Sequence, residues 1–230
     1  MSKFGIIQVE LQDVMGTDRQ IAEAAWTSSL DKQKAEARTD ADVERIVKML
    51  AEKGHSVPFE SVVFRFWMRV PIFTDRQIIT HRIASHSGLS GRYRTMPDDY
   101  YQLPQDVIDI AAKAGADTLV EEYADSIETS YNSYMASLFA LKNAEKEKTI
   151  TNDEFKRARE VLRGQLPTAG MTERTTVMNL RSWANFYKLR SKPDAQPEIQ
   201  QVAKLMYEQI KASGKIPVAL EALEKHNWTI

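Results

Sequence analysis

The chain has 230 residues and a mass of 26.2 kDa, with 43% hydrophobic and 27% charged residues. This composition is ordinary for a globular protein and excludes a chain that is disordered throughout. Lysine and arginine number 31 against 32 aspartate and glutamate, so the net charge of −1 gives no general attraction to nucleic acid polymers or membranes. Cysteine is absent, which excludes disulfides, cysteine-ligated zinc, iron–sulfur clusters and thiolate nucleophiles.

No apolar run approaches the roughly 18 residues that a membrane span needs. The first residues, Met1 to Gly5, also lack the apolar stretch of a secretory signal. We therefore expect a cytoplasmic protein.

Hydrophobic periodicity predicts the elements of the first half of the chain. Residues 5–13 partly alternate between apolar and polar and predict a strand, and residues 40–54 have the i, i+3, i+4, i+7 spacing of a helix that stops at a glycine. Residues 63–70 alternate between two faces, one of which carries two arginines, and predict a second strand. The proline at 71 suits the first turn of a helix over 71–85, and a loop is expected over 86–103.

The second half of the chain is predicted to be helical. After Pro104, apolar residues recur every three or four positions and predict one long helix, or two helices separated near Gly115. A capping box predicts a helix over 151–164, and two more helices are expected over 176–189 and 195–212.

Strands interleaved with long helices indicate the α+β class. We expect a small, mostly antiparallel sheet covered by long helices. No internal repeat or low-complexity tract divides the chain, so a single domain over residues 1–230 is predicted.

Positive charge is concentrated in one segment of this nearly neutral chain. Residues 76–94 carry four arginines and two histidines next to a single acid, Asp75. The tripeptide Ser90-Gly91-Arg92 combines a hydroxyl, a small flexible backbone and a guanidinium, which can all donate to a phosphate. From composition alone, a nucleotide phosphate site and a solvated arginine-rich face remain equally open.

The same segment carries a family signature. Residues 76–85 and 89–93 resemble the flavin-dependent thymidylate synthases, in which an Arg-His-Arg triplet is followed seven residues later by serine. His81, Arg82 and Ser90 match that signature. Further matches occur in the family's order over about 190 residues; they lie at 9–16, 54–60, 163–167, 179–190 and 195–199.

The resemblance implies a reaction. Members of this family methylate dUMP reductively at C5, with methylenetetrahydrofolate as the carbon donor and FAD, reduced by NADPH, as the hydride source. It also implies a homotetramer with sites at subunit interfaces. The absence of cysteine agrees, because the unrelated folate-dependent thymidylate synthases need a cysteine nucleophile.

The resemblance also implies residue roles. The positions that match substrate contacts are Gln77, Ser90, Gly91, Arg92, Arg163 and Arg190. Among them, Arg190 is the candidate catalytic residue, because it matches the arginine that stabilises negative charge at N3 of the pyrimidine. The positions that match flavin contacts are Thr80, His81, Arg82, Asn179, Arg181 and Asn185.

Four of these residues have a structural alternative. His81 could be a packed core histidine, and Arg190 a cation at a helix C-terminus. Arg163 could be a solvated arginine, with Arg159 competing for its alignment. Asn179 could cap a helix.

The chain departs from the family pattern at three places. Thr80 stands where the family has the first arginine of the triplet, and Ser61 where it commonly has histidine. Ser87-Gly88 replaces an Asn-Glu pair and so removes a carboxylate.

These departures leave two alternative functions open. One is a flavin- and folate-dependent methyl- or hydroxymethyltransferase that acts on another pyrimidine nucleotide such as dCMP. The other is a flavin- or nucleotide-binding protein without turnover.

Overall fold

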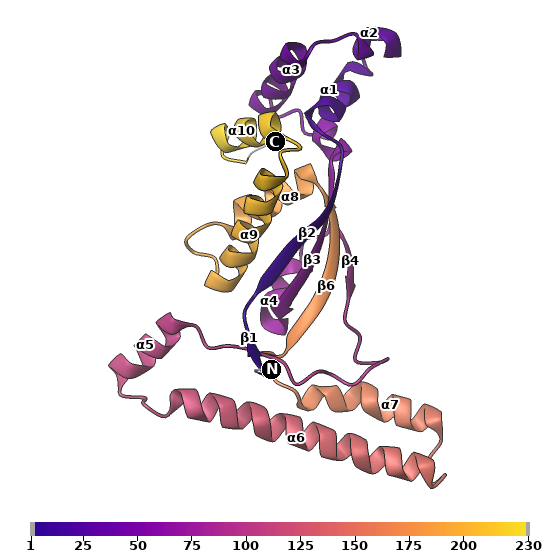
Figure 1. The fold of residues 1–230 in the computed structure, drawn as a ribbon, viewed down its shortest axis with the longest axis vertical. Helices are drawn as coiled ribbons and strands as arrows, with labels where there is room; N and C mark the ends of the chain where they lie inside the picture. Colours follow the sequence, from indigo (N-terminus) through magenta and orange to yellow (C-terminus); the bar gives the residue numbers. More distant parts are fainter. Residues whose placement is uncertain (1–2, 229–230) are drawn as a thin grey trace. The chain divides into compact units, whose positions relative to one another are not determined.

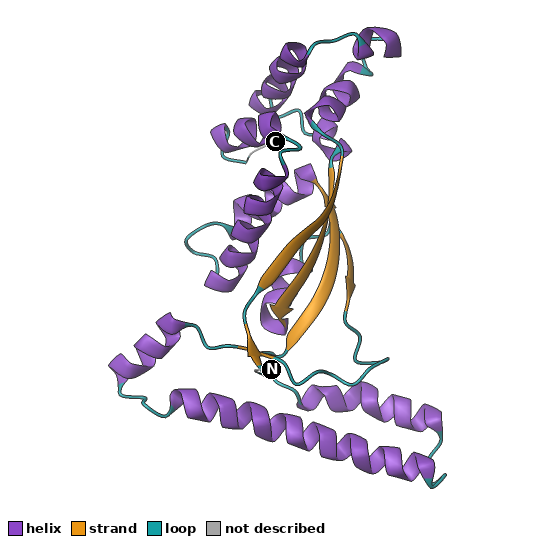
Figure 2. Cartoon of the chain, viewed as in Figure 1, coloured by secondary structure: helices purple, strands orange, loops and turns teal. Residues whose placement is uncertain are grey.

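The computed structural model describes residues 3–228, which form two compact units (Figures 1 and 2). The first unit comprises residues 3–6, 71–73 and 89–172, and the second comprises residues 7–70, 74–88 and 173–228. Both units combine segments that lie far apart in the sequence. The prediction of a single domain over residues 1–230 stays a prediction.

Most of a four-stranded sheet, in the order β2-β3-β6-β4, lies in the second unit. Its strands are β2 (Gln8–Met15), β3 (Val63–Pro71), β4 (Ser85–Gly88) and β6 (Met171–Asn179). The pairs β2–β3 and β4–β6 are antiparallel. This confirms the predicted α+β class with a small, mostly antiparallel sheet.

The predicted alternation of the second strand is confirmed in β3. Phe64, Phe66, Met68 and Val70 are fully buried, whereas the intervening residues are exposed to different degrees. Alternate side chains of a strand point to opposite faces, so this row provides one wall of the core. Trp183 packs edge-on against Phe64, with ring centroids 5.8 Å apart, and anchors α8 over the sheet.

The second unit also contains helices that pack on the sheet and on one another. They are α1 (Asp18–Trp26), α2 (Lys32–Glu36), α3 (Asp40–Glu52), the 3-10 helix η1 (Val57–Ser61), α4 (Ile72–Ile78), α8 (Leu180–Arg190), α9 (Pro197–Ser213) and α10 (Pro217–Lys225). The helix α9 packs against β2, and α8 packs against α9 and η1. At the other end of this unit, α3 packs against α1 and α10.

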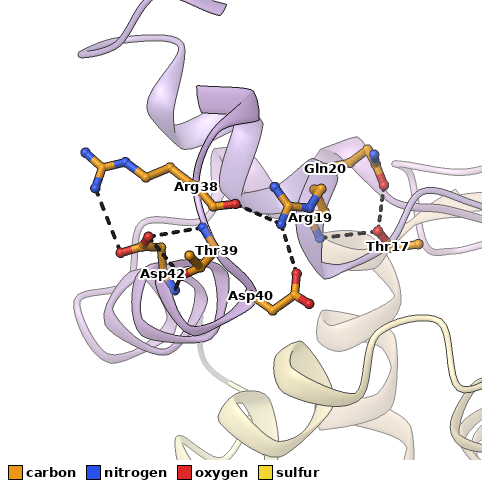
Figure 3. A network of polar contacts seen from close by, with 7 residues as sticks. All are labelled: Thr17, Arg19, Gln20, Arg38, Thr39, Asp40 and Asp42. Atoms are coloured by element: carbon orange, nitrogen blue, oxygen red, sulfur yellow. Dashed lines mark hydrogen bonds and ion pairs between the residues drawn. The ribbon is translucent and has the colours of Figure 1, made fainter. Parts of the chain in front are cut away.

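A polar network joins α1 to the start of α3 (Figure 3). Arg19 donates to the carbonyl of Arg38 at 3.1 Å and to the carboxylate of Asp40 at 2.9 Å. Thr39 and Asp42 form a capping box, which satisfies backbone donors at the first turn of α3. These bonds fix where α3 begins.

The first unit is a helical hairpin with a short parallel strand pair. The strands are β1 (Phe4–Gly5) and β5 (Tyr100–Tyr101), and the helices are α5 (Gln105–Ala114), α6 (Leu119–Lys146), α7 (Asn152–Leu162) and the short η2 (Arg163–Gln165). Figure 1 shows α7 returning along α6, and the two helices pack together. Gly115 has φ 70°, which confirms the predicted break in the long helical region. The predicted capping box at Thr151 is also confirmed.

Two predicted helices are partly wrong. The helix over 71–85 ends at Ile78, and residues 85–88, predicted in part as loop, form strand β4 instead. The helix expected from 176 begins only at Leu180, because residues 171–179 are strand β6. Residues 85–88 pair with 174–177, so long-range backbone pairing decided both segments, helped by β-branched residues in β6.

Within residues 3–228, no helix is both long enough and apolar enough to cross a lipid bilayer.

Candidate active site

The helix α8 organises one half of the predicted site. The Asn179 side chain accepts a hydrogen bond of 2.8 Å from the backbone N–H of Ser182, so Asn179 caps the helix. Buried residues on one side of α8 hold it against the core. Arg181 and Asn185, one turn apart, therefore share another face, as predicted. The cap uses the Asn179 oxygen, as the structural alternative for this residue proposed.

That face of α8 lines a cavity of about 520 Å³ within the second unit. This volume lies in the range of ligand sites in proteins. The lining residues are Thr80, His81, Arg82, Ile83, Met178, Arg181, Ser182, Asn185, Lys188, Leu189, Arg190 and Trp228. Five of the six predicted flavin contacts are thus brought together with the predicted catalytic arginine, while Asn179 stands at the N-terminus of the same helix.

Arg190 is held in a fixed position on the wall of this cavity. Its Nε donates to Nε2 of His81 at 3.1 Å, and its Nη2 donates to Oγ1 of Thr80 at 3.2 Å and to the carbonyl of Gln77 at 3.4 Å. Thr80 itself donates to the same Gln77 carbonyl at 2.7 Å. Among the described residues, Nη1 of Arg190 has no hydrogen-bond partner, so it is the part of the guanidinium left for a ligand.

The imidazole of His81 is neutral at physiological pH. Burial, together with the positive charge of Arg190 and a smaller effect of His86, lowers the pKa of His81 to about 4. Because Nε2 accepts the bond from Arg190, the proton of the neutral ring is assigned to Nδ1. The ring also packs edge-on against Phe186, with centroids 4.7 Å apart. His81 is therefore both a packed histidine and a cavity residue.

Arg181, which lines the cavity, is paired with an acid. Its Nη1 forms an ion pair of 2.7 Å with Glu60 of η1, and both side chains are partly exposed. The neighbouring Ser182 has a buried hydroxyl with no hydrogen-bond partner among the described residues. Cations, an unpaired hydroxyl and the amide of Asn185 at one cavity form a donor set that fits an anionic heterocyclic cofactor.

The predicted phosphate residues form a separate cluster within the first unit. A Cβ added to Gly91 would lie 3.0 Å from Cδ of Arg163, so glycine permits the close approach of this arginine. Arg92 forms an ion pair of 2.7 Å with Glu160, and Arg163 donates to the Glu160 carbonyl at 3.0 Å. The bond from Arg92 lowers the pKa of Glu160 and keeps it ionised.

Arg159 belongs to the same cluster. It donates to the backbone carbonyl of Arg92, and its buried Nε has no partner among the described residues. The structure therefore brings Arg159 and Arg163 together beside Ser90-Gly91-Arg92, where the sequence treated them as competitors. Three arginines, Arg92, Arg159 and Arg163, thus gather at this segment, and only Arg92 among them pairs with a carboxylate of the described residues. Guanidiniums in excess of carboxylates suit a dianion such as a phosphate.

Comparison with known proteins identifies the family. Residues 10–214 match the family described as "Thymidylate synthase complementing protein". The chain is 34% identical over 224 residues to the flavin-dependent thymidylate synthase of Thermotoga neapolitana, with 96% of this chain and 92% of that protein covered. It is 33% identical to the enzyme of that name from Kosmotoga olearia, with 96% and 91% covered.

The chain belongs to the flavin-dependent thymidylate synthase family. Membership confirms the predicted family, its enzyme class and a flavin cofactor. The fold resembles that of the UMP/dUMP methylase PolB from Streptomyces cacaoi bound with 5-Br dUMP, with a TM-score of 0.78, 23% identity and 98% of both chains covered. This likeness confirms the predicted fold.

The residues that depart from the family pattern each make specific local contacts. Thr80 anchors Arg190, so its hydroxyl has a local role although the guanidinium is lost. Ser61 donates to the Pro58 carbonyl at 2.6 Å and so stabilises its own turn. Gly88 lies over the guanidinium of Arg174: a Cβ on Gly88 would lie 3.3 Å from Nη2.

Arg174 forms a bidentate pair with Asp75, in which Nη2 and Oδ2 are 2.6 Å apart. Both side chains are mostly buried, at 13% and 11% exposed. Spacing did not reveal this pair, because its members lie 99 positions apart in the sequence. Ser182, Lys188 and Trp228 were also missed as cavity residues. Ser182 and Lys188 are on the predicted helix, but Trp228 had no sequence signal.

Proposed function

We propose that this member of the flavin-dependent thymidylate synthase family converts dUMP to dTMP. Methylenetetrahydrofolate would supply a one-carbon unit at the oxidation level of formaldehyde, and NADPH would supply the electrons that reduce it to a methyl group. When bound, FAD carries the hydride between reductant and substrate. The observation that carries the proposal is Arg190, fixed by three acceptors in a cavity that also holds five of the six predicted flavin contacts.

Arg190 is assigned to the pyrimidine. Its bonds to His81, Thr80 and Gln77 orient the guanidinium before substrate binds, so negative charge that develops on the ring meets a donor already in place. His81 cannot act as an acid near neutral pH, because its Nε2 accepts from Arg190 and its pKa is about 4. Its role is therefore to position Arg190.

The resemblance assigns the nucleotide phosphate to Ser90, Gly91, Arg92 and Arg163. Arg159 donates to the backbone carbonyl of Arg92, which supports including it among these residues. The Gln77 amide donates to Gln196 at 2.5 Å, so binding of substrate by Gln77 would require exchange of this bond. The flavin is assigned to Thr80, His81, Arg82, Asn179, Arg181 and Asn185, of which Arg82 is exposed at the cavity.

We further propose, from the resemblance, a homotetrameric enzyme that binds folate. From the composition we propose a cytoplasmic protein that binds no nucleic acid polymer or membrane. A second candidate function keeps the flavin and folate but takes dCMP, or transfers a hydroxymethyl group. Gly88 favours this second function, because the carboxylate that the family has at this position is missing. The guanidinium of Arg174 lies next to Gly88 instead.

One experiment separates these functions and the non-catalytic alternative. The purified protein is loaded with FAD, and the visible absorbance of the flavin is followed after addition of NADPH and methylenetetrahydrofolate with either dUMP or dCMP. We expect bleaching by NADPH and formation of dTMP from dUMP. Product from dCMP alone would support the second candidate, and flavin binding without product from either nucleotide would support a binding protein.

A further inference from the structure

Trp228 lies on the wall of the cavity that contains Arg181, Asn185 and Arg190. Neither the family signature nor the helical pattern assigned it a role. Its side chain is partly exposed although three other aromatic rings contact it. A partly exposed indole at a cavity lined by cations and amides is a suitable surface for a planar ring.

The backbone at Trp228 has a strained conformation. The helix α10 ends with the N–H of Trp228 bonded to the Leu223 carbonyl at 2.7 Å, a closing bond that requires a single left-handed residue, Asn227 with φ 50°. Trp228 has φ 57° as well. A bulky residue in this region is an outlier, and such outliers persist only where the surroundings hold them, often at functional sites.

An aromatic cluster holds the indole. Its ring centroid lies 4.5 Å from that of Tyr187, 5.4 Å from that of Trp183 and 5.8 Å from that of Tyr207. The Trp183 and Tyr207 rings meet it edge-on, at 89° and 88°, and Tyr187 is tilted by 56°. None of these three contacts is a parallel stack. The cluster therefore fixes the orientation of Trp228 without covering it with a parallel ring.

We propose that Trp228 stacks on a planar heterocycle of bound FAD. The inference rests on the proposed function, because it requires that the cavity holds the flavin. Arg181 and Ser182 of the same cavity supply donors for the polar parts of FAD, and the indole supplies a rigid apolar face for one of its two ring systems, the isoalloxazine or the adenine.

The test compares the FAD affinity of Trp228→Leu and Trp228→Phe with that of the wild type. Trp67→Phe is the matched control, because Trp67 is partly exposed on β3 and does not line the cavity. Loss of a base–aromatic stack predicts roughly 10- to 100-fold weaker FAD binding for Trp228→Leu, a smaller loss for Trp228→Phe and no change for Trp67→Phe. Titrations with FMN and with ADP identify the ring, since each carries only one of the two.

A second readout does not depend on the leucine variant folding. In wild-type protein labelled with 5-fluorotryptophan, the fluorine resonance that is absent from Trp228→Phe should shift when FAD is added. An unchanged resonance, or wild-type FAD affinity in a folded Trp228→Leu protein, would overturn the role of Trp228. Failure of the wild type to bind FAD at all would overturn the proposed function instead.

Discussion

Arg190 at the end of α8 and His81 beyond the end of α4 are joined by one hydrogen bond of 3.1 Å across 109 positions of sequence. Burial and the charge of the guanidinium keep the imidazole neutral, and the imidazole fixes the direction of the guanidinium. This pairing makes His81 a positioning residue. It also makes the stability of the fold depend on pH, because protonation of His81 would break this bond.

The first prediction concerns stability at acid pH. The pKa of His81 is lowered from 6.5 to about 4, so between these values the unfolded chain binds a proton that the folded chain does not. The free energy of unfolding should therefore fall as the pH is lowered from about 6.5 to 4, by about 2 kcal/mol after allowance for solvent screening of a half-buried group. Burial also lowers the pKa of His86, which acts in the same direction.

Urea unfolding at fixed protein concentration, at several pH values, measures this slope. His81→Gln is the control, because the amide oxygen can accept from Arg190 but does not titrate. The slope should be smaller in this variant. Equal slopes in both proteins would contradict the assignment.

Replacement of Arg190 should reduce turnover more than binding. An interaction made mainly in the transition state lowers kcat and kcat/KM together, whereas uniform binding changes only KM. We expect Arg190→Ala to lower the rate of dTMP formation by roughly 100-fold or more, with flavin content unchanged. Arg190→Lys should recover little, because it lacks the planar fork. A wild-type rate in Arg190→Ala, or loss of flavin without a further effect on turnover, would contradict this role. Arg190 would then be a cation that interacts with the C-terminus of its helix.

Arg92 should recognise the phosphate group specifically. Loss of a charge-assisted hydrogen bond in Arg92→Ala should weaken dUMP binding by about 10- to 100-fold and leave deoxyuridine binding nearly unchanged. Glu160→Gln should have the opposite effect and tighten dUMP binding, because it releases Arg92 from its 2.7 Å ion pair. Calorimetric titration with nucleotide and nucleoside distinguishes this from a structural role, which would weaken both equally.

Arg181 should contribute to flavin affinity. Arg181→Ala is expected to raise the dissociation constant of FAD, because the cation lies at the cavity on the same helix face as Asn185. Glu60→Gln should have the reverse effect, since Glu60 pairs with Arg181 at 2.7 Å and competes with an anionic cofactor. Flavin fluorescence titration provides both constants, and identical values in all three proteins would remove Arg181 from the flavin site.

The Asp75–Arg174 pair should be a stability element. Because both side chains are almost buried, removal of one partner leaves an uncompensated charge, and Arg174→Met should lower the free energy of unfolding by about 3–5 kcal/mol. The double variant Asp75→Leu with Arg174→Met should regain much of this loss. Urea unfolding of the two single variants, Asp75→Leu and Arg174→Met, and of the double variant measures this cycle. A loss below about 1 kcal/mol in Arg174→Met would contradict the prediction.

Local patterns predicted the elements whose stability is local. The capping box at Thr151, the break at Gly115 and the alternation of β3 each depend on neighbours within a few residues. Periodicity failed for 85–88 and 171–179. The hydrogen bonds of these strands run between segments about 90 positions apart, and no local preference contains that information.

For the candidate site as well, the sequence determined some properties and the tertiary structure determined others. By itself, the sequence determined the family, through a signature around His81, Arg82 and Ser90, and it determined that no thiol takes part, through the absence of cysteine. A sequence signature and an absent residue type can both be read without knowing which residues are in contact.

Only the tertiary structure decided what those residues touch. It joined Arg190 to His81 and Thr80, paired Arg174 with Asp75 beneath Gly88, and brought Trp228 to the cavity of α8. Hydrogen bonds and ring contacts act over a few ångströms, whereas these partners are separated by tens to more than a hundred residues along the chain. Their proximity is a property of the packed fold, and the protonation state of His81 follows from it.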